Sequence, residues 1–590
     1  MRLVRLHCLL IRGVCGHLFF IWTKGVYNVH MNDLHGEKGN MRTWWKEAVF
    51  YQIYPRSFKD STGDGNGDIK GIISRLDYLK DLGIDAIWLS PVYRSPMVDN
   101  GYDISDYHEI DPIFGTMDDM DDLIREIHGR DMKLIMDLVI NHTSDEHPWF
   151  IESKSSRNNP KRDWYIWRDA KNGKEPNNWA SDFGGSAWEW DDETEQYYLH
   201  LFSKKQPDLN WDNPDVKDAV FAMMRWWLGK GVDGFRMDVI NFIKKAPGLP
   251  DAPRHDGDTR AYIHGEGLYA NQPGIHELLN EMRREVLLPS GAIAFGEMYF
   301  LSPETGLEYV AYDRHELDML FQYPIIEQRG NWPGVKYQTR VWHDVFDAYG
   351  WNSITLGNHD NPRAVSMFGD DKRYREASAK LIATYLLTAP GTPFIYQGDE
   401  IGMTNSFFEH VEDFTDIKLK QLFNERVNRG EAGESVLADL SWWSRDNART
   451  PMQWDSGANA GFTKGEPWFC VNDNFNTINV AEQSRSGSSI LGYYKKLIHI
   501  KKKRLVLTYG TYEPLRPDDW TVWACRRAFE GEEVIIVFNF ASEDNSIDTP
   551  DELRSGKAKL LLSNYDNAAV IDDVLTMRPW EARLYIKEQE

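Results

Sequence analysis

The sequence predicts an α/β fold: a parallel (β/α)8 TIM barrel with a small domain inserted after strand three and a C-terminal antiparallel β-domain. Short apolar runs alternate with segments of helical spacing from residue 44 onward. One stretch of about 70 residues interrupts this alternation, and after residue 508 the pattern changes to strands and turns. The expected divisions are an N-terminal extension at 1–40, the barrel at 41–141 and 212–508, an inserted domain at 142–211 and a β-domain at 509–590.

Eight apolar runs, each six to eight residues long, are the expected barrel strands. Helices are expected between them, for example at 71–82 and 117–129, and a further helix at 488–502 precedes the β-domain. A barrel of this kind carries its active site at the carboxyl ends of the strands. The expected strands are 49–55, 86–91, 133–140, 232–239, 292–298, 316–323, 352–358 and 392–398.

Two segments fall outside the alternation. The stretch 142–211 is rich in Trp, Asn, Asp and Gly and shows no helical period, so we expect a small irregular domain over the barrel mouth. In the C-terminal part, the runs WTVWACRRAF, VIIVFNF and KLLLSN are separated by polar turns, which is typical of antiparallel strands.

The first residues do not fit a membrane span. Residues 1–24 carry four positive charges, and the uncharged run 13–23 is 11 residues long, far too short to cross a bilayer. No A-x-A-like cleavage site follows, and Met31 and Met41 both precede the first expected strand. We expect an extension translated from an upstream start; a working signal peptide, and with it secretion, is the alternative.

Composition excludes several classes of protein. The 590 residues include 91 acidic and 67 basic side chains, a net charge of −24, which argues against nucleic acid and against an anionic membrane surface. The four cysteines show no metal-ligand spacing, and a chain this poor in cysteine favours a reducing compartment, the cytoplasm. Aromatic residues make up 13%, which suits either large cores or flat ligands such as sugars. The cysteines are Cys8, Cys15, Cys470 and Cys525.

Charged residues recur where the expected strands end. A single acid at such a place is usually a helix cap or a solvated loop residue. Three acids together with an arginine and two histidines in one barrel instead indicate catalysis. Arg236 and Asp238 are two residues apart, so a strand points both to the same face. The set is His142 after strand three, Arg236 and Asp238 after strand four, Glu297 after strand five, and His359 and Asp360 after strand seven.

This set suits glycoside hydrolysis. One carboxylate attacks the anomeric carbon, and a second, with a raised pKa, protonates the leaving oxygen. A third holds sugar hydroxyls and disperses charge in the oxocarbenium-like transition state. A cation two residues before the nucleophile is expected to keep that carboxylate ionised.

The motifs DLVINHTS, QPDLNW, GFRMDVINF, FGEM and GNHDNPR appear in this order. With them the chain resembles the α-amylase superfamily (glycoside hydrolase family 13), and within it the oligo-1,6-glucosidase, dextran glucosidase and sucrose isomerase group. The resemblance covers Trp44 to about Glu590. It implies a retaining enzyme with Asp238 as nucleophile, Glu297 as general acid/base and Asp360 as transition-state stabiliser.

The same resemblance implies the substrate-binding residues. It places His142, Arg236 and His359 around the glucosyl ring at the cleavage point. It also implies a pocket closed behind the non-reducing end, and a closed pocket means exo-action on small oligosaccharides. The resemblance further implies that no organic cofactor is needed. The closing residues it implies are Asp99, Tyr102 and Arg449.

The loop DSTGDGNGDIKG has the alternating oxygen ligands of the first nine positions of a calcium loop. Gly71 stands where an EF-hand needs glutamate, so the pattern is not an EF-hand. The family resemblance implies a structural Ca²⁺ or Mg²⁺ site, with Asn66 contributing a carbonyl; a metal-free turn is the alternative. The ligand candidates are Asp60, Thr62, Asp64, Asn66 and Asp68, where many relatives have Asn in place of Thr62.

Specificity depends on few residues. In this group, a valine after the nucleophile, here Val239, goes with α-1,6 bonds. Sucrose isomerases carry an arginine-paired motif after strand six, whereas IIEQRGNW has Arg329 alone, which favours water as the acceptor. We therefore expect a monomeric α-glucosidase acting on isomaltose, isomaltooligosaccharides and isomaltulose. Sucrose isomerisation or other transglucosylation is the alternative, and a non-catalytic barrel subunit a remote one.

Overall fold

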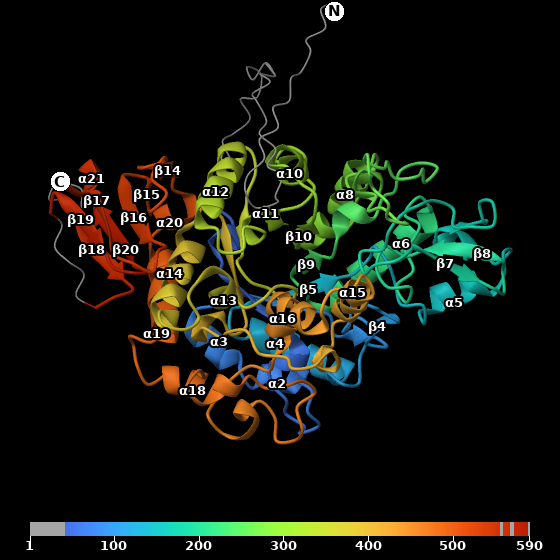
Figure 1. Ribbon diagram of the computed structural model, residues 1–590, viewed down its shortest axis with the longest axis horizontal. Coiled ribbons are helices and arrows are strands. Elements are labelled where there is room, and N and C mark those ends of the chain that lie inside the picture. Colours follow the sequence, from blue (N-terminus) through green and yellow to red (C-terminus); the bar gives the residue numbers. More distant parts are fainter. Residues whose placement is uncertain (1–41, 555–557, 567–571, 588–590) are drawn as a thin grey trace, which may run out of the picture. The chain divides into compact units, whose positions relative to one another are not determined.

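The computed structural model describes residues 42–554, 558–566 and 572–587, and eight parallel strands form its central sheet (Figure 1). The strand order is β11-β10-β9-β5-β2-β1-β13-β12, and every neighbouring pair is parallel. The strands are β1 (Phe50–Ile53), β2 (Ala86–Leu89), β5 (Lys133–Leu138), β9 (Gly234–Met237), β10 (Ile293–Met298), β11 (Met319–Gln322), β12 (Ser353–Ile354) and β13 (Thr392–Tyr396). All eight lie inside the ranges expected from the sequence, so the predicted fold class is confirmed.

Side chains join the two edge strands of this sheet. The Ser353 hydroxyl on β12 donates to the Leu320 carbonyl on β11 at 2.6 Å, and the Gln322 amide donates to the Ser353 carbonyl at 3.2 Å. The sheet therefore curls into a nearly closed barrel.

Aromatic rings from strands that are not neighbours in the sheet meet inside the barrel. Phe50 on β1 contacts Phe295 on β10 at a centroid distance of 5.8 Å, and Phe321 on β11 contacts Phe394 on β13 at 4.8 Å. The barrel interior is a packed core rather than a pore, which leaves room for a ligand only at its end.

The helices largely follow the expected pattern, with one difference. The segment expected as one helix is divided into α2 (Ile69–Ile73) and α3 (Leu76–Leu82), because Arg75 leaves the helical conformation at φ −117° and ψ 5°. Helix α4 (Met117–His128) begins with a capping box between Thr116 and Asp119. Other helices around the barrel are α6 (Pro214–Lys230), α8 (Ile275–Met282), α10 (Pro303–Val310), α12 (Trp332–Phe346), α14 (Arg375–Thr388) and α19 (Ile490–Lys503).

The inserted segment is more regular than the sequence suggested. It contains α5 (Pro148–Ser155) and a three-stranded antiparallel sheet in the order β6-β8-β7. Its two ends are joined, since the Leu209 amide donates to the Asn141 carbonyl at 2.9 Å. The sheet strands are β6 (Trp167–Arg168), β7 (Trp188–Asp191) and β8 (Gln196–Leu199).

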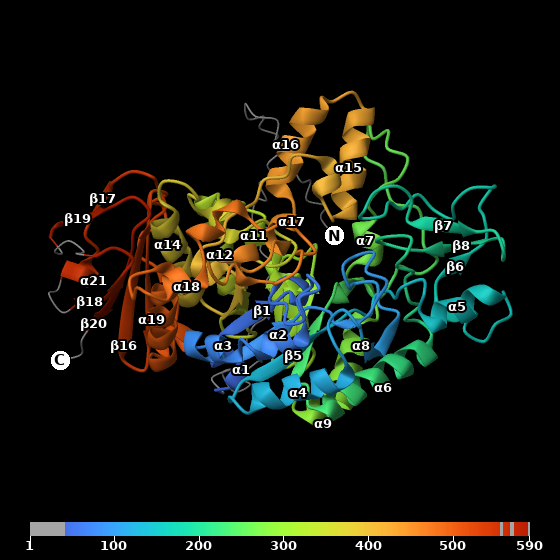
Figure 2. The ribbon, with the colours of Figure 1, turned by 90° about the horizontal axis from the view of Figure 1, so that it is seen from below.

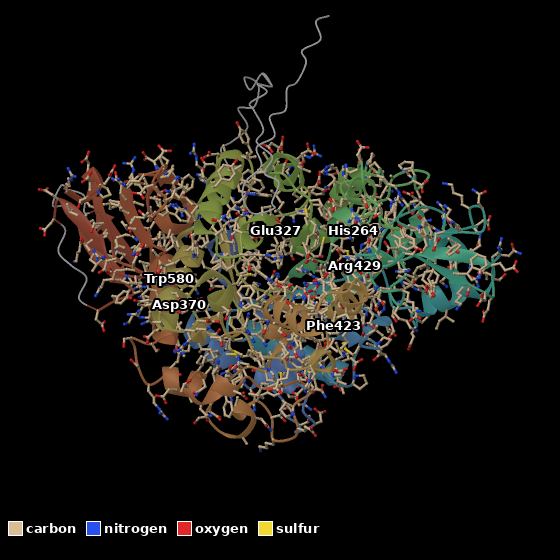
Figure 3. The ribbon with its side chains drawn as sticks, in the orientation of Figure 1. His264, Glu327, Asp370, Phe423, Arg429 and Trp580 are labelled. Atoms are coloured by element: carbon tan, nitrogen blue, oxygen red, sulfur yellow. The ribbon has the colours of Figure 1, made fainter. Side chains whose placement is uncertain are left out.

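A helical hairpin after β13 was not expected from the sequence. It consists of α15 (Ile417–Asn428) and α16 (Gly433–Trp443), which pack against each other (Figure 2). Phe423 on α15 and Arg429 at the end of that helix are labelled in Figure 3. The buried residues beneath the hairpin include Leu419 and Leu440.

The C-terminal β-domain is confirmed as antiparallel. A five-stranded sheet has the order β14-β15-β16-β20-β18, and β17 pairs with β19. The fully buried Arg527 on β15 donates to the Thr388 carbonyl at the end of α14 at 2.6 Å, which connects this domain to the barrel. The strands are β14 (Glu513–Pro514), β15 (Val522–Phe529), β16 (Glu532–Asn539), β17 (Asn545–Asp548), β18 (Ala558–Ser563), β19 (Val574–Met577) and β20 (Ala582–Lys587).

The expectations for residues 1–40, including Cys8 and Cys15, lie outside the described residues. Cys470 and Cys525 are both free thiols. Among the helices that the structure describes, none combines the length and the apolar character needed to span a bilayer.

Candidate active site

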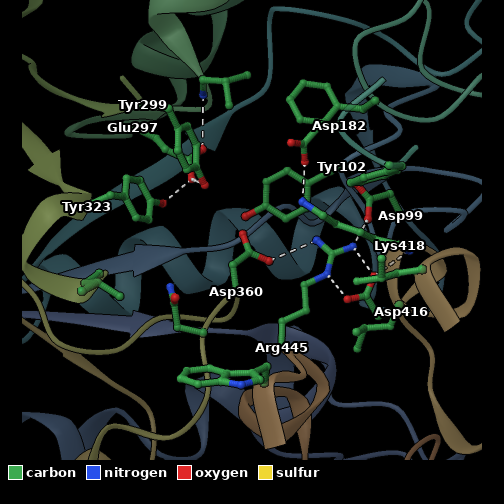
Figure 4. A pocket seen from close by; sticks show the side chains of 18 of the residues that line it. Asp99, Tyr102, Asp182, Glu297, Tyr299, Tyr323, Asp360, Asp416, Lys418 and Arg445 are labelled. Atoms are coloured by element: carbon green, nitrogen blue, oxygen red, sulfur yellow. Dashed lines mark hydrogen bonds and ion pairs between the residues drawn. The ribbon is translucent and has the colours of Figure 1, made fainter. Parts of the chain in front are cut away.

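A pocket of about 550 Å³ opens at the carboxyl ends of the barrel strands (Figure 4). This volume is in the range of small-molecule sites. The inserted domain contributes Asp182 and Phe202 to its wall, and the helical hairpin contributes Lys418 and Trp443. The residues expected from the sequence that line it are Asp99, Tyr102, His142, Asp238, Val239, Glu297 and Asp360; Arg236, His359 and Arg449 are buried.

Arg236 lies among three carboxylates. One guanidinium nitrogen lies 2.7 Å from both Asp137 and Asp238, and the other lies 2.5 Å from Glu297. The strands impose this arrangement, because Asp137 on β5 and Arg236 on β9 are paired in register. Asp137 also accepts hydrogen bonds from Trp88 and Tyr102, so it holds the arginine in place without lining the pocket.

Asp238 lies close to other carboxylates in a buried site. Burial raises the pKa of Asp238, and the carboxylates of Glu297 and Asp137 raise it further, while Arg236 lowers it. Arg236 therefore lowers the pKa of Asp238, as expected from the sequence, but it does not by itself keep Asp238 ionised. Burial raises the pKa of Asp137 too, to about 6, so two carboxyl groups with raised pKa values contact the same guanidinium nitrogen.

Two tyrosines fix the Glu297 carboxyl group. The Tyr299 hydroxyl donates to Glu297 Oε1 at 3.2 Å, and the Tyr323 hydroxyl donates to the same oxygen. The two rings stack on each other with centroids 4.3 Å apart. Glu297 Oε2 accepts from the Val239 backbone N–H at 3.3 Å. The sequence reasoning missed both tyrosines, which follow strand ends five and six.

Val239 has a left-handed backbone, with φ 35° and ψ 42°. This conformation is strained for a β-branched residue. It directs the Val239 N–H toward Glu297 while its side chain lines the pocket beside Phe242. The residue after the expected nucleophile therefore contributes to the position of the expected acid.

Asp360 has the opposite electrostatic environment to Asp238. Burial alone would raise its pKa, but His359, Arg445 and Arg449 hold it well below the usual aspartate range. Arg449 Nη2 lies 2.9 Å from Asp360 Oδ1, and Arg445 Nη1 lies 3.3 Å from the same oxygen. Asp360 is therefore an ionised carboxylate next to the Asp238–Glu297 pair.

The two histidines are neutral. Burial lowers the pKa of His359 to about 3 and that of His142 to about 4. His142 Nε2 donates to the Tyr102 carbonyl at 3.1 Å, and the Tyr102 ring stacks on His359 at 5.2 Å. Gln52 contacts His359 Nδ1 at 2.8 Å. Both imidazoles thus have fixed positions beside the pocket.

Arg445 closes one end of the pocket, where the sequence reasoning chose Arg449. Arg445 lies 3.1 Å from Asp99 and 2.8 Å from Asp416 (Figure 4). Arg449 does not line the pocket; it lies behind Asp360 and donates to the His359 carbonyl. The two arginines are four residues apart in one motif, so only the fold shows which one faces the ligand.

The helical hairpin and the inserted domain meet above the closed end. Lys418 on α15 lies 2.7 Å from Asp182 of the inserted domain. Phe183 lies beneath the Arg445 guanidinium at 5.5 Å. No sequence signal identified this contact, because it joins segments more than 230 residues apart.

The loop expected to bind a metal is closed by its own hydrogen bonds. Asp60 accepts from the backbone N–H groups of Thr62, Gly63 and Gly65, at 2.7 to 2.9 Å. Asp68 accepts from the Ser61 and Gly71 amides, at 2.7 and 2.6 Å. Within the described part of the chain, no three His, Cys, Asp or Glu residues converge as a ligand cluster. The calcium assignment stays a prediction.

The chain was compared with known proteins. Residues 52–510 match the family "Alpha amylase, catalytic domain". The oligo-1,6-glucosidase of Parageobacillus thermoglucosidasius is 51% identical over 559 residues, which cover 92% of this chain and 99% of that protein. The isomaltulose synthase of Protaminobacter rubrum has a similar structure, with a TM-score of 0.89 at 44% identity, covering 93% of this chain and 100% of that one. The trehalulose synthase of Pseudomonas mesoacidophila gives 0.88 at 44% identity, with the same coverage.

Proposed function

The chain belongs to the α-amylase family of glycoside hydrolases, and on that premise we propose that it hydrolyses non-reducing-end α-1,6-glucosidic bonds of short oligosaccharides. The observation that carries the proposal is the Asp238–Glu297 pair on Arg236, in a pocket closed at one end by Asp99 and Arg445. A closed end admits one terminal glucosyl unit, so isomaltose, isomaltooligosaccharides and isomaltulose fit, and a cut inside a long polymer does not.

In the first step, ionised Asp238 attacks the anomeric carbon of the terminal glucose. Glu297 transfers its proton to the bridging oxygen, the carbon–oxygen bond breaks, and the leaving sugar departs. Asp238 then carries a β-glucosyl ester, and Glu297 is a carboxylate. The hydroxyls of Tyr299 and Tyr323 hold that carboxylate at its Oε1 atom.

In the second step, Glu297 takes a proton from water, and the water oxygen attacks the anomeric carbon from the face that the leaving sugar vacated. The ester bond to Asp238 breaks, and α-glucose leaves with retained configuration. Arg445 and Arg449 keep Asp360 ionised. Its carboxylate binds hydroxyl groups of the sugar ring and stabilises the positive charge that develops in both transition states.

Substitution of the nucleophile tests the assignment. Asp238→Asn should abolish hydrolysis of p-nitrophenyl α-glucoside, because the amide cannot form the ester. Full activity in this variant would remove Asp238 from the mechanism.

Sucrose isomerisation is the second candidate, favoured by the similarity to isomaltulose and trehalulose synthases. The single Arg329 after strand six favours hydrolysis instead. Product analysis on isomaltose, maltose, sucrose and isomaltulose separates the two: glucose and fructose from sucrose mean hydrolysis, and a new disaccharide means isomerisation.

We further propose a cytoplasmic monomer that needs no organic cofactor, with Ca²⁺ or Mg²⁺ as the candidate ion for the loop 60–68. The cytoplasm is proposed because the chain has few cysteines.

A further inference from the structure

Phe300 combines exposure with a strained backbone at the pocket mouth. It lines the pocket, is 49% exposed and has φ 59°. The left-handed region is rare for a bulky residue, and glycine or asparagine would occupy it at lower cost. About half of the side chain is exposed, so burial in the core does not account for an aromatic residue with this backbone.

A buried amide network holds this conformation. The Asn241 side chain donates to the Tyr299 carbonyl at 2.8 Å, and the Asn271 side chain donates to the Phe300 carbonyl at 3.4 Å. Both the Asn241 amide, at 3.1 Å, and the Tyr309 hydroxyl, at 2.8 Å, donate to Asn271 Oδ1. Asn241 is fully buried. A strained backbone persists where its surroundings over-determine it, and such sites are concentrated around functional groups.

Phe300 lines the same pocket as Glu297, the group proposed to protonate the leaving oxygen. It follows Glu297 by three residues and lies two residues beyond the end of β10 at Met298. The glucosyl end of the pocket is where Asp99, Asp416 and Arg445 close it (Figure 4). The leaving sugar, whose oxygen Glu297 protonates, therefore lies in the pocket that Phe300 lines.

Phe300 is also a pocket-lining aromatic residue whose ring is half exposed. The rings of Tyr299 and Tyr323 stack on each other, and the Arg329 guanidinium covers Trp443 at 4.0 Å. Phe300 has one face on Phe242, with rings 2° from parallel, and half of its surface is exposed. A ring backed by a second ring on one face presents a flat apolar surface on the other.

We propose that Phe300 determines specificity by stacking against the leaving sugar of the substrate, and against the acceptor sugar when glucose is transferred to sugar instead of water. This inference rests on the proposed α-glucosidase function. The Asn241–Asn271–Tyr309 network acts as its positioning element.

The test uses substrates with and without a leaving sugar. Phe300→Asn and Phe300→Gly both accept the left-handed backbone, so both should fold. For isomaltose we expect kcat/KM to fall about 10-fold, while for α-glucosyl fluoride it should stay within about two-fold of the wild-type value. Phe300→Trp should keep isomaltose activity. Phe407→Asn, at a 77% exposed aromatic residue outside the pocket lining, is the matched control and should change neither.

An unchanged kcat/KM for isomaltose in both Phe300 variants would overturn the proposal, as would an equal loss on both substrates, which indicates a general structural effect. A wild-type protein that cleaves neither substrate would instead contradict the proposed function, so the two failures are distinguishable. The ratio of transfer to hydrolysis at high isomaltose should fall in the same variants.

Discussion

Arg445→Ala removes the cation that closes the pocket. The side chains of Asp99 and Asp416, its partners at 3.1 and 2.8 Å, are 8% and 3% exposed. The variant leaves two buried carboxylates without their cation. Removing one partner of a buried ion pair costs about 3 to 5 kcal/mol. Because Asp99 and Asp416 can protonate in response, we expect the free energy of unfolding at pH 7 to fall by about 3 kcal/mol.

The same variant should lose activity. Asp99 loses its ion pair with Arg445, and Asp360 loses one of the three arginines that lower its pKa. Loss of such a positioned charge reduces kcat/KM by about 100- to 1,000-fold. Since Asp360 acts as a carboxylate, a higher pKa removes activity as the pH falls, and the acid limb of the pH profile should move to higher pH.

Urea unfolding and isomaltose kinetics measure both effects. Arg526→Ala is the control, because Arg526 pairs with Glu513 on the surface, where the side chains are 32% and 52% exposed. That pair contributes about 1 kcal/mol or less. If Arg445→Ala unfolds and hydrolyses isomaltose like Arg526→Ala, the reasoning about the closed end is refuted.

Three further predictions follow from single residues. Burial raises the pKa of Asp399 to about 7 from 3.8, so its protonated form contributes stability that is lost as the pH rises from about 4 to about 7. Asp399→Asn should make the fall in the free energy of unfolding over this range smaller, and an identical pH dependence in urea unfolding would contradict this. If the loop 60–68 binds calcium, the midpoint temperature of thermal unfolding should be higher in Ca²⁺ than in EDTA, and Asp64→Ala should abolish this difference. Equal midpoint temperatures for the wild-type protein would argue for a metal-free turn. Val239→Ala enlarges the space for the leaving sugar, so the ratio of kcat/KM for isomaltose to that for maltose should fall; an unchanged ratio would exclude Val239 as a determinant of linkage preference.

The fold was predictable because strands buried on both faces appear as short apolar runs in the sequence. The eight runs mark the barrel, and the acids at their ends mark the pocket, since parallel strands bring their carboxyl ends together. Asp238, Glu297 and Asp360 were found by this reasoning together with the family motifs.

Other parts of the site depend on the three-dimensional path of loops. Arg445 and Arg449 lie in one motif, and the turn of α17 (Asp446–Arg449) decides which faces the pocket. The contact between Lys418 and Asp182 joins distant segments without a local pattern. The left-handed backbones of Val239 and Phe300 arise from tertiary contacts that oppose the intrinsic preference of both residues.

Burial also changed the electrostatics that the sequence suggested. The position of Arg236, two residues before Asp238, indicated an ionised nucleophile. Burial and the neighbouring carboxylates nevertheless raise the pKa of Asp238 by more than Arg236 lowers it. Attack by Asp238 requires its ionised form, which Arg236 favours at 2.7 Å and burial opposes.

Double displacement by Asp238 and Glu297 fixes the anomeric form of the first glucose that the enzyme releases. Proton NMR during the first minutes of isomaltose hydrolysis resolves α- from β-glucose before mutarotation mixes them. The account predicts that α-glucose is released first from the non-reducing unit, because two inversions retain the configuration. Initial release of β-glucose from that unit would contradict it.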